Sequence, residues 1–202
     1  MAIRDNREYR NLGTFEHNAE DSEFIVRGYA STFEPYLMFD DDGIQYFERI
    51  APTAFEDADM SDVVFLRDHT GRVLARTKNG ALNLTTDTHG LLSVTDLGLT
   101  SASKEMFEDI RTGNYSQMSF SFVVARGGEH FEEEARKVTR VIDRIEKLYD
   151  VSAVSIPAND ATEISVRNLS DGVIEKIQAE RLEAKRLEVR RRATMKRGLS
   201  ND

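Results

Sequence analysis

Three serines stand among large apolar residues in the stretch NYSQMSFSFV, residues 114–123. In a β-strand alternate side chains share a face, so the apolar side chains would face one way and Ser119 and Ser121 the other. Hydroxyls at such positions can pack under a neighbouring strand or exchange local hydrogen bonds. A serine becomes a nucleophile only when a base lies about 2.6–3.2 Å away and a third group orients that base. The pattern alone leaves both interpretations open.

The candidates for such a base are His17, His69, His89 and His130. Three of these histidines stand in polar loops or turns, where exposed side chains without a catalytic role are common. His69 differs because it follows the apolar strand VVFLRD, so it would lie where a rigid scaffold meets a loop. Functional groups favour such places. A histidine that merely caps or packs against the strand would fit the same position.

A carboxylate that could orient an imidazole stands in the segment LYDVSAVSIPAND, where Asp150 begins an apolar strand. Asp150 would share a face with Ser152. It could hold a histidine in the tautomer that a nucleophile–base–acid triad requires, or it could accept backbone hydrogen bonds at the strand end. Ser119, His69 and Asp150 therefore permit a serine hydrolase but do not require one.

Metal and thiol chemistry find little support in the sequence. The chain has no cysteine, which excludes disulfides, thiolate catalysis and cysteine-ligated zinc. Asp68 beside His69 raises a metal alternative, but no second histidine stands at ligand spacing. The run FDDDG superficially resembles a calcium loop, yet Met38 and Arg49 would occupy two ligand positions, so we predict a solvated turn. We expect no metal and no cofactor.

Short β-branched and aromatic segments separated by turn residues predict about seven strands. Breaks between strands are expected at Gly71, Asn79-Gly80 and His89-Gly90. The Asn-Gly pair is a typical hairpin signal. Gly28, inside the segment EFIVRGYASTFE, suggests a bulge or a close approach of two backbones. Residues 126–137, RGGEHFEEEARK, are interpreted as a polar excursion between strands.

Two helices are expected beside these strands. The segment APTAFEDA would form a short helix opened by Pro52. The segment SASKEMFEDIRTGN would form a longer helix, with Thr100 or Ser101 as its N-cap. Gly113 would end this helix. The pattern predicts a mainly β fold, a barrel or a sandwich with flanking helices, rather than a doubly wound sheet.

Charge divides the 202-residue chain into two parts. Residues 171–198 contain nine Lys or Arg and five Asp or Glu, a net charge of +4 within a chain of −9, so the remainder carries −13. Apolar residues near helical spacing predict a basic helical tail over residues 169–202, after a body of residues 1–168. The acidic body argues against nucleic acid as a partner. We also expect no membrane segment and no signal peptide.

Five segments resemble, in order and in approximate spacing, the prohead proteases of tailed bacteriophages: VRGYASTFE, FERIAPTAF, VVFLRDHTGRVLARTKNGALNLTTDTHGL, GNYSQMSFSFVV and LYDVSAVSIPANDAT. The resemblance covers residues 24–167. It implies a fold like that of the herpesvirus capsid-maturation proteases, a closed β-barrel wrapped by helices. It also implies that Ser119 is the nucleophile, His69 the general base and Asp150 the third member of a triad.

The sequence departs from this family pattern at two positions. Ser121 stands where glycine is common, and Thr70 stands where an acid is often found. Neither departure removes a required chemical group. The herpesvirus relatives use an arginine-bearing loop to stabilise the oxyanion, which makes the loop of Arg126, Gly127 and Gly128 a candidate for that role.

The resemblance implies a serine endopeptidase that cleaves the scaffold protein, or the scaffold-like segment of the major capsid protein, and also itself. The enzyme would act in the host cytoplasm, inside the assembling prohead, and the herpesvirus analogy suggests a homodimer. The basic tail could bind acidic scaffold helices, be removed by self-cleavage, or be a solvated helix without a partner. The alternative is a catalytically inactive scaffold or assembly protein that retains the protease barrel.

Overall fold

A computed structural model describes residues 7–16 and 23–155 of the chain. The chain divides into two units, Met1–Ala161 and Thr162–Asp202, and the second lies wholly outside the described residues. The expected basic tail and His17 also lie outside them. The boundary at residue 168 therefore stays a prediction, and the fold below is that of the first unit.

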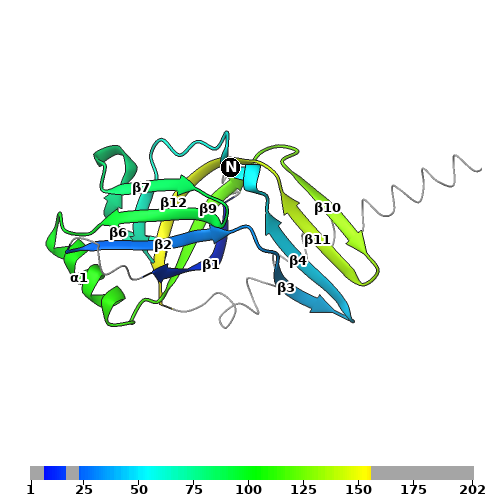
Figure 1. Cartoon of the computed structure of the whole chain (residues 1–202), viewed down its shortest axis with the longest axis horizontal. Coiled ribbons are helices and arrows are strands. Elements are labelled where there is room, and N and C mark those ends of the chain that lie inside the picture. Colours follow the sequence, from blue (N-terminus) through cyan, green and yellow to red (C-terminus); the bar gives the residue numbers. More distant parts are fainter. Residues whose placement is uncertain (1–6, 17–22, 156–202) are drawn as a thin grey trace, which may run out of the picture. The chain divides into compact units, whose positions relative to one another are not determined.

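Eight strands form the larger sheet, in the order β6-β5-β12-β9-β1-β2-β8-β7 (Figure 1). Their bounds are β1 (Glu8–Glu16), β2 (Ile25–Thr32), β5 (Val64–Arg67), β6 (Thr70–Arg76), β7 (Leu82–Thr86), β8 (Gly90–Asp96), β9 (Gln117–Val124) and β12 (Ile145–Val154). All pairs are antiparallel except β12 with β5. The sheet curves into a nearly closed barrel, which confirms the mainly β fold expected from the sequence.

A second sheet of four strands has the order β10-β11-β4-β3 and lies beside the barrel in Figure 1. Its strands are β3 (Tyr36–Asp41), β4 (Ile44–Ile50), β10 (Glu129–Glu134) and β11 (Lys137–Ile142). The turn between β3 and β4 consists of Asp42 and Gly43, both with positive φ, as a two-residue hairpin requires. Asp40 Oδ1 accepts a hydrogen bond from the backbone N–H of Gly43 (3.0 Å). The acidic run is thus the solvated turn that the sequence predicts.

The α-helix and one of the two 3₁₀ turns of the described residues lie near the positions where helices were expected. Helix α1 (Ser101–Arg111) has Thr100 as its N-cap, because the Thr100 hydroxyl accepts a hydrogen bond from the Ser103 N–H (3.1 Å). Gly113 has a φ of 82° just beyond the helix end. The segment opened by Pro52 forms the 3₁₀ turn η1 (Pro52–Phe55). In the described part of the chain no helix is long and apolar enough to span a membrane.

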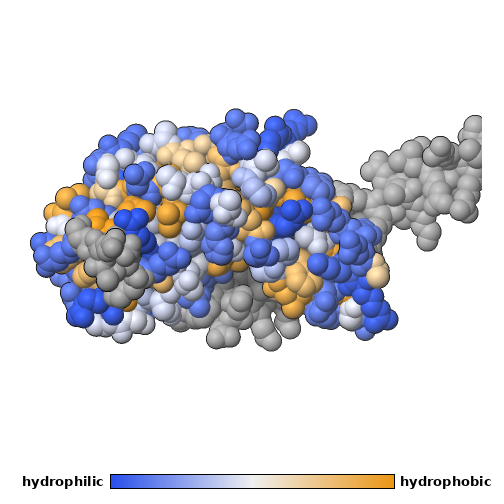
Figure 2. Space-filling view, in the orientation of Figure 1, coloured by the Kyte–Doolittle hydropathy of each residue, from blue (hydrophilic) through white to orange (hydrophobic). Residues whose placement is uncertain are grey.

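The barrel interior is apolar and closely packed, whereas the face drawn in Figure 2 is largely hydrophilic with hydrophobic residues in separate patches. The largest fully buried side chains include Phe65, Phe120, Phe122, Ile50, Leu91, Leu97 and Met118. At Gly28 an added Cβ would lie 2.6 Å from the Thr14 carbonyl oxygen, which confirms the expected close backbone approach. At Gly13 it would lie 1.4 Å from the Tyr29 carbonyl oxygen, so only glycine fits.

A buried ionic network joins the barrel to the second sheet. Glu48 of β4 is completely buried between Arg10 of β1 (2.7 Å) and Arg140 of β11 (2.8 Å). Glu8 of β1 accepts hydrogen bonds from the same two guanidinium groups (2.6 Å each). Burial raises the pKa of Glu48, but the two adjacent arginines outweigh burial and hold it below its ordinary value. Because removal of one partner would leave a buried charge, the network fixes β1 against β4 and β11.

The expected strand break at Gly71 is wrong, and the break at Asn79-Gly80 is present but is not the hairpin that the sequence suggests. The turn between β5 and β6 consists of Asp68 and His69, and Gly71 lies inside β6. Asn79-Gly80 forms no hairpin, because Gly80 ends a short 3₁₀ turn and the flanking strands β6 and β7 lie at opposite edges of the sheet. The expected turn at His89-Gly90 is confirmed, since it joins the paired strands β7 and β8.

The expected polar excursion over residues 126–137 is also wrong in part. Glu129–Glu134 forms strand β10, which pairs along its whole length with β11. The sequence gives little sign of this strand, because a run of glutamates has low β propensity. Pairing with the apolar strand β11 determines its conformation, as context often does in sheets. The described residues therefore contain twelve strands, eight of them in the barrel sheet.

Candidate active site

Strand β9 separates its apolar and hydroxyl side chains onto opposite faces, as the alternation of its sequence predicts. Phe120 and Phe122 are completely buried in the barrel core, where their rings stack 4.8 Å apart. Ser119 and Ser121 therefore face the outer side of the sheet. Even there Ser119 is only 3% exposed and Ser121 is completely buried, so each hydroxyl requires a polar partner.

Strand β12 supplies a carboxylate and a hydroxyl group directly opposite the two serines of β9. The antiparallel register pairs Asp150 with Ser121 and Ser152 with Ser119. Directly opposed residues in such a pair project from the same face, with Cβ atoms about 4.5–5.5 Å apart. The register alone thus brings Asp150 and the two serines of β9 together.

His69 reaches the same face from the turn between β5 and β6. Asp68 and His69 have φ values of 47° and 56°, a left-handed conformation that glycine favours. For other residues this conformation costs about 1–3 kcal/mol each and persists only where the surroundings enforce it. The turn lies beside β12 because β5 is the parallel neighbour of β12.

Several hydrogen bonds to Asp68 hold this strained turn. The backbone N–H of Asp68 donates to the Ala153 carbonyl (2.9 Å). Its carboxylate accepts hydrogen bonds from the Tyr115 hydroxyl (3.0 Å) and from the backbone N–H of Ser155 (3.1 Å). Asp68 therefore anchors the histidine-bearing turn to the segment before β9 and to the end of β12.

Ser119, His69 and Asp150 form a continuous hydrogen-bonded series. His69 Nδ1 lies 2.6 Å from Asp150 Oδ1, and His69 Nε2 lies 2.6 Å from Ser119 Oγ. An ionised carboxylate can only accept, so Nδ1 carries the proton and Nε2 is left to accept from the serine hydroxyl. The structure thus brings together all three residues selected from the sequence, in the order in which an imidazole can deprotonate a hydroxyl.

Asp150 is held by further hydroxyl groups. Ser152 Oγ donates to Asp150 Oδ1 (2.8 Å), and Ser121 Oγ donates to Asp150 Oδ2. Burial raises the pKa of Asp150, but hydrogen bonding and charge interaction with His69 and the two hydroxyl bonds outweigh burial. The pKa of Asp150 therefore lies below its ordinary value of 3.8, and the carboxylate is ionised at neutral pH.

Four residues around the series were not selected from the sequence as supporting groups. These are Ser121, Ser152, Asp68 and Tyr9. The Tyr9 ring meets the His69 ring edge to face at 4.7 Å, and Tyr9 lies opposite Ser121 in the β1–β9 register. The face-sharing of Ser152 with Asp150 was visible in the strand alternation. Nothing in the sequence pattern relates Tyr9 to the histidine, and Asp68, the sequence neighbour of His69, was considered only as a metal ligand.

The other histidines of the described residues lie outside this series. His89 is exposed in the turn before β8, with its ring 4.4 Å from that of Tyr29. His130 is exposed on β10 and pairs with Asp143 (2.5 Å), whose hydrogen bond raises the pKa of His130. Among the described residues, neither histidine forms a hydrogen bond with a serine hydroxyl.

The expected oxyanion loop lies far from the series. Arg126 follows Ser119 by seven residues, beyond the opposite end of β9. Only five of these steps lie in strand β9, which ends at Val124 and spans about 16 Å from Ser119, and the chain then turns, with the Gly128 N–H donating to the Ala125 carbonyl (2.8 Å). The loop of Arg126, Gly127 and Gly128 therefore follows the end of β9 opposite to Ser119, which does not support it as the oxyanion site.

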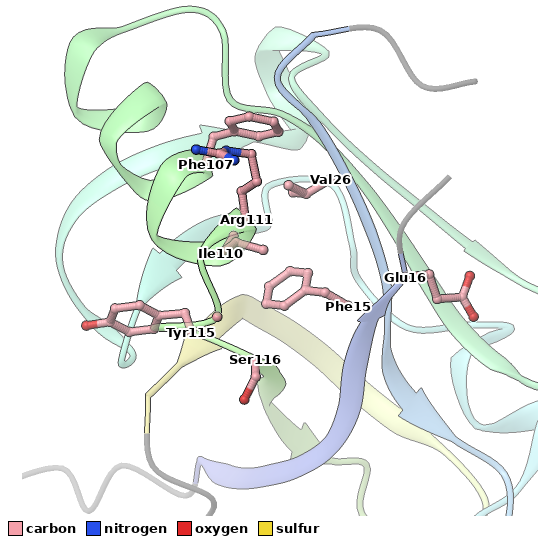
Figure 3. Close-up of a pocket in the computed structure, with 9 residues that line it drawn as sticks. Phe15, Glu16, Val26, Phe107, Ile110, Arg111, Tyr115 and Ser116 are labelled. Carbon is pink, nitrogen blue, oxygen red and sulfur yellow. The ribbon is translucent and has the colours of Figure 1, made fainter. Parts of the chain in front are cut away.

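A pocket of about 190 Å³ lies at the start of β9 (Figure 3). Its lining includes Phe15, Phe107, Ile110, Tyr115 and Ser116. None of the three residues of the hydrogen-bonded series lines it. Among the described residues no group of three or more His, Cys, Asp or Glu side chains is arranged to hold a metal ion.

A hydroxyl, an imidazole and a carboxylate hydrogen-bonded in series on a β-barrel are the arrangement by which serine hydrolases activate their nucleophile. The chain belongs to the Caudovirus prohead serine protease family, whose sequence profile matches residues 12–176. Membership places the protein among the bacteriophage serine proteases of capsid maturation. Comparisons with curated proteins and with solved structures gave no significant match.

Replacement of Asp150 by asparagine should destabilise the protein in a pH-dependent way. Since the folded-state pKa of Asp150 is depressed, its ionised form contributes stability above the unfolded value of 3.8. That contribution is lost as the pH falls through the folded value. The difference in unfolding free energy between wild type and Asp150→Asn should be largest near neutral pH and shrink below about pH 4, as measured by urea unfolding.

Asp57→Asn is the matched control, because Asp57 is exposed. It should show no comparable difference across the same pH series. A stability difference for Asp150→Asn that stays constant down to the most acidic pH would contradict the depressed pKa of Asp150.

Proposed function

We propose that the protein is an active serine endopeptidase in which Ser119 is the nucleophile, His69 the general base and Asp150 the residue that orients His69. The observation that carries the proposal is the pair of 2.6 Å contacts that link the hydroxyl, imidazole and carboxylate in that order. A serine hydroxyl at its free pKa is a weak nucleophile, and an adjacent oriented base is what activates it. Membership in a serine protease family agrees with this function.

In the acylation step Ser119 Oγ attacks the carbonyl carbon of the scissile peptide while His69 Nε2 accepts the hydroxyl proton. The tetrahedral intermediate carries a negative charge on oxygen. Asp150 is already ionised, so it stabilises the imidazolium that forms on His69. His69 then donates the proton to the leaving amine, the C–N bond breaks, and an acyl-enzyme ester remains on Ser119.

In the deacylation step water replaces the amine as the group next to His69. His69 removes a proton from the water, the resulting oxygen attacks the ester carbonyl, and Ser119 recovers its proton as the acyl group leaves. The edge contact of Tyr9 and the hydrogen bond to Asp150 keep the imidazole in one orientation through both steps. The cycle requires no cofactor.

The substrate class follows from the family. A prohead serine protease would act on capsid or scaffold proteins inside the assembling capsid in the host cell. We propose that the substrates are the scaffold protein, or the scaffold-like segment of the major capsid protein, together with the protease itself. An inactive assembly protein could keep the barrel without catalysis, but it would have no need of the complete hydrogen-bonded series at Ser119.

Replacement of Ser119 by alanine should abolish processing. When the chain is co-expressed with the capsid and scaffold proteins of its phage, the wild type should shorten them and itself. Ser119→Ala should reduce the cleavage rate at least about 1000-fold, because the loss of a triad nucleophile has effects of that order or larger. Gel analysis and mass spectrometry of the products measure the cleavage of the substrates and of the protease itself.

Ser101→Ala is the matched control, because Ser101 is an exposed serine at the start of α1. It should process its substrates at the wild-type rate. Identical uncleaved bands for wild type and Ser119→Ala would refute the enzymatic function and favour the inactive assembly protein.

A further inference from the structure

The two outward serines of β9 have different hydrogen-bond partners, so they can play different roles in hydrolysis. Ser119 contacts His69 Nε2 at 2.6 Å, whereas Ser121 donates to Asp150 Oδ2. Resting on the function proposed above, we propose that Ser121 is a positioning residue for the hydrolysis. Its hydroxyl holds the Asp150 carboxylate so that Oδ1 faces His69. The nucleophile and the anchor are thus two residues apart on one strand.

The sheet places Ser121 where a short hydroxyl side chain can reach the carboxylate. Ser121 and Asp150 are directly paired residues of β9 and β12. Strand β9 is interior to the sheet, hydrogen-bonded to β1 on one side and to β12 on the other. Both groups are nearly inaccessible, with exposed fractions of 0% and 4%. A bond between two groups on paired interior strands has little freedom to rearrange.

The geometry of the carboxylate explains why an anchor on Oδ2 matters. His69 and Ser152 both bind Oδ1, at 2.6 and 2.8 Å. The terminal torsion of an aspartate is broad, so contacts on one oxygen restrain the rotation of the carboxylate less than contacts on both oxygens. Ser121 binds the other oxygen and opposes that rotation. Ser152 cannot replace Ser121, because it shares the oxygen that His69 uses.

The anchor is also one of the groups that keep Asp150 charged. Burial disfavours the ionised carboxylate, and the Ser121 hydroxyl is among the partners that lower the pKa of Asp150. Loss of that hydroxyl would leave a buried oxygen without this donor, which raises the pKa of Asp150. Glycine, which the family resemblance leads one to expect at position 121, could not make the bond. The anchor is therefore a feature of this chain's own sequence.

Ser121→Ala tests the proposal through kcat and through the titration of Asp150. With a peptide that spans a cleavage site, kcat should fall about 10-fold while KM changes less than about 2-fold, since a 10-fold loss corresponds to about 1.4 kcal/mol, the order of one hydrogen bond. The NMR titration of the Asp150 carboxyl should move to higher pH, because the carboxylate has lost one hydrogen-bond donor. Ser121→Thr keeps a hydroxyl and should recover most of the wild-type rate and the wild-type titration of Asp150.

Ser93→Ala is the matched control for the loss of a buried hydroxyl. Ser93 is 1% exposed on β8, and its hydroxyl contacts Thr95 rather than Asp150. It should leave kcat and the titration of Asp150 unchanged. Thermal unfolding of each variant shows whether lost activity reflects lost folded protein, and ¹³C NMR of the Asp150 carboxyl carbon follows its titration directly.

The proposal is overturned if Ser121→Ala keeps the wild-type kcat, or if its Asp150 resonance titrates at the wild-type pH. It is also overturned if activity falls only in proportion to the folded fraction. An inactive wild type would refute the proposed function, and the NMR titration would still decide whether Ser121 holds Asp150.

A second inference comes from an irregularity in β1. Arg10 pairs with Phe120 and Gly13 pairs with Met118, so Asn11 and Leu12 together oppose the single residue Ser119. This is a β-bulge, a feature that redirects side chains and is frequent beside active sites. The bulge lies on the β1 side of Ser119, whereas Asp150 and the turn that carries His69 lie on the β12 side.

The side chain of Asn11 lies over the same face as the nucleophile. Asn11 Nδ2 donates to Gln117 Oε1 at 2.8 Å. Gln117 precedes Ser119 by two residues on β9 and therefore shares its face. On the basis of the proposed function, we infer that the Asn11 carboxamide donates a hydrogen bond to the oxyanion that forms when Ser119 attacks. The bond to Gln117 sets the plane of this carboxamide, with the base and the donor on opposite flanks of Ser119.

Asn11→Ala should lower kcat about 100-fold with little change in KM, because removal of one oxyanion donor costs about 10²–10³ in kcat. The NMR titration of Asp150 should stay at the wild-type pH, which distinguishes this variant from Ser121→Ala. Asn11→Asp, which replaces the donor by an acceptor of similar shape, should be at least as impaired. Asn83→Ala, an exposed asparagine on β7, is the control and should be fully active.

The inference fails if folded Asn11→Ala retains kcat within about threefold of wild type, a smaller effect than oxyanion donors produce. It also fails if Asn11→Asp is as active as the wild type. Either result with an active wild type leaves the proposed function intact, whereas an inactive wild type would refute both.

Discussion

The pairing of β9 with β12 is the interaction on which the candidate site depends. It opposes Ser121 to Asp150 and Ser119 to Ser152, so the hydroxyl and carboxylate groups meet on the outer face while the phenylalanines of β9 fill the core. A slip of one residue in β9 would turn the serines inward and the phenylalanines out. The core thus opposes a one-residue slip of the site's register, because that slip would expose the aromatic side chains of β9.

The imidazole of His69 comes from a turn and not from the paired strands. His69 stands in a two-residue turn whose left-handed backbone is unfavourable for Asp68 and His69. Asp68 offsets this cost through its bonds to Tyr115 and Ser155, which join the turn to segments adjoining β9 and β12. On the side of β9 opposite to β12, the buried ion pairs around Glu48 fix β1, the strand that carries Tyr9. The site therefore combines a regular sheet with one strained turn.

Much of the site could be predicted from the sequence, since strand alternation is a local property. The stretch NYSQMSFSFV already separates apolar from hydroxyl side chains, and the strand positions of His69 and Asp150 made both candidates. Their convergence depends on contacts far apart in sequence, so the residues alone left alternatives open, and the family resemblance selected among them. The turn at Asp68 was missed because Gly71 offered a stronger local signal, and β10 was missed because pairing, not propensity, forms it.

The central claim is that His69 activates the Ser119 hydroxyl, and covalent labelling tests it most directly. A serine-reactive phosphonate diester should form an adduct that mass spectrometry maps to Ser119 in the wild type. The His69→Ala variant should keep the fold and label at least about 100-fold more slowly, because an unassisted serine is a weak nucleophile. Labelling at another residue, or equal rates in wild type and His69→Ala, would contradict the account.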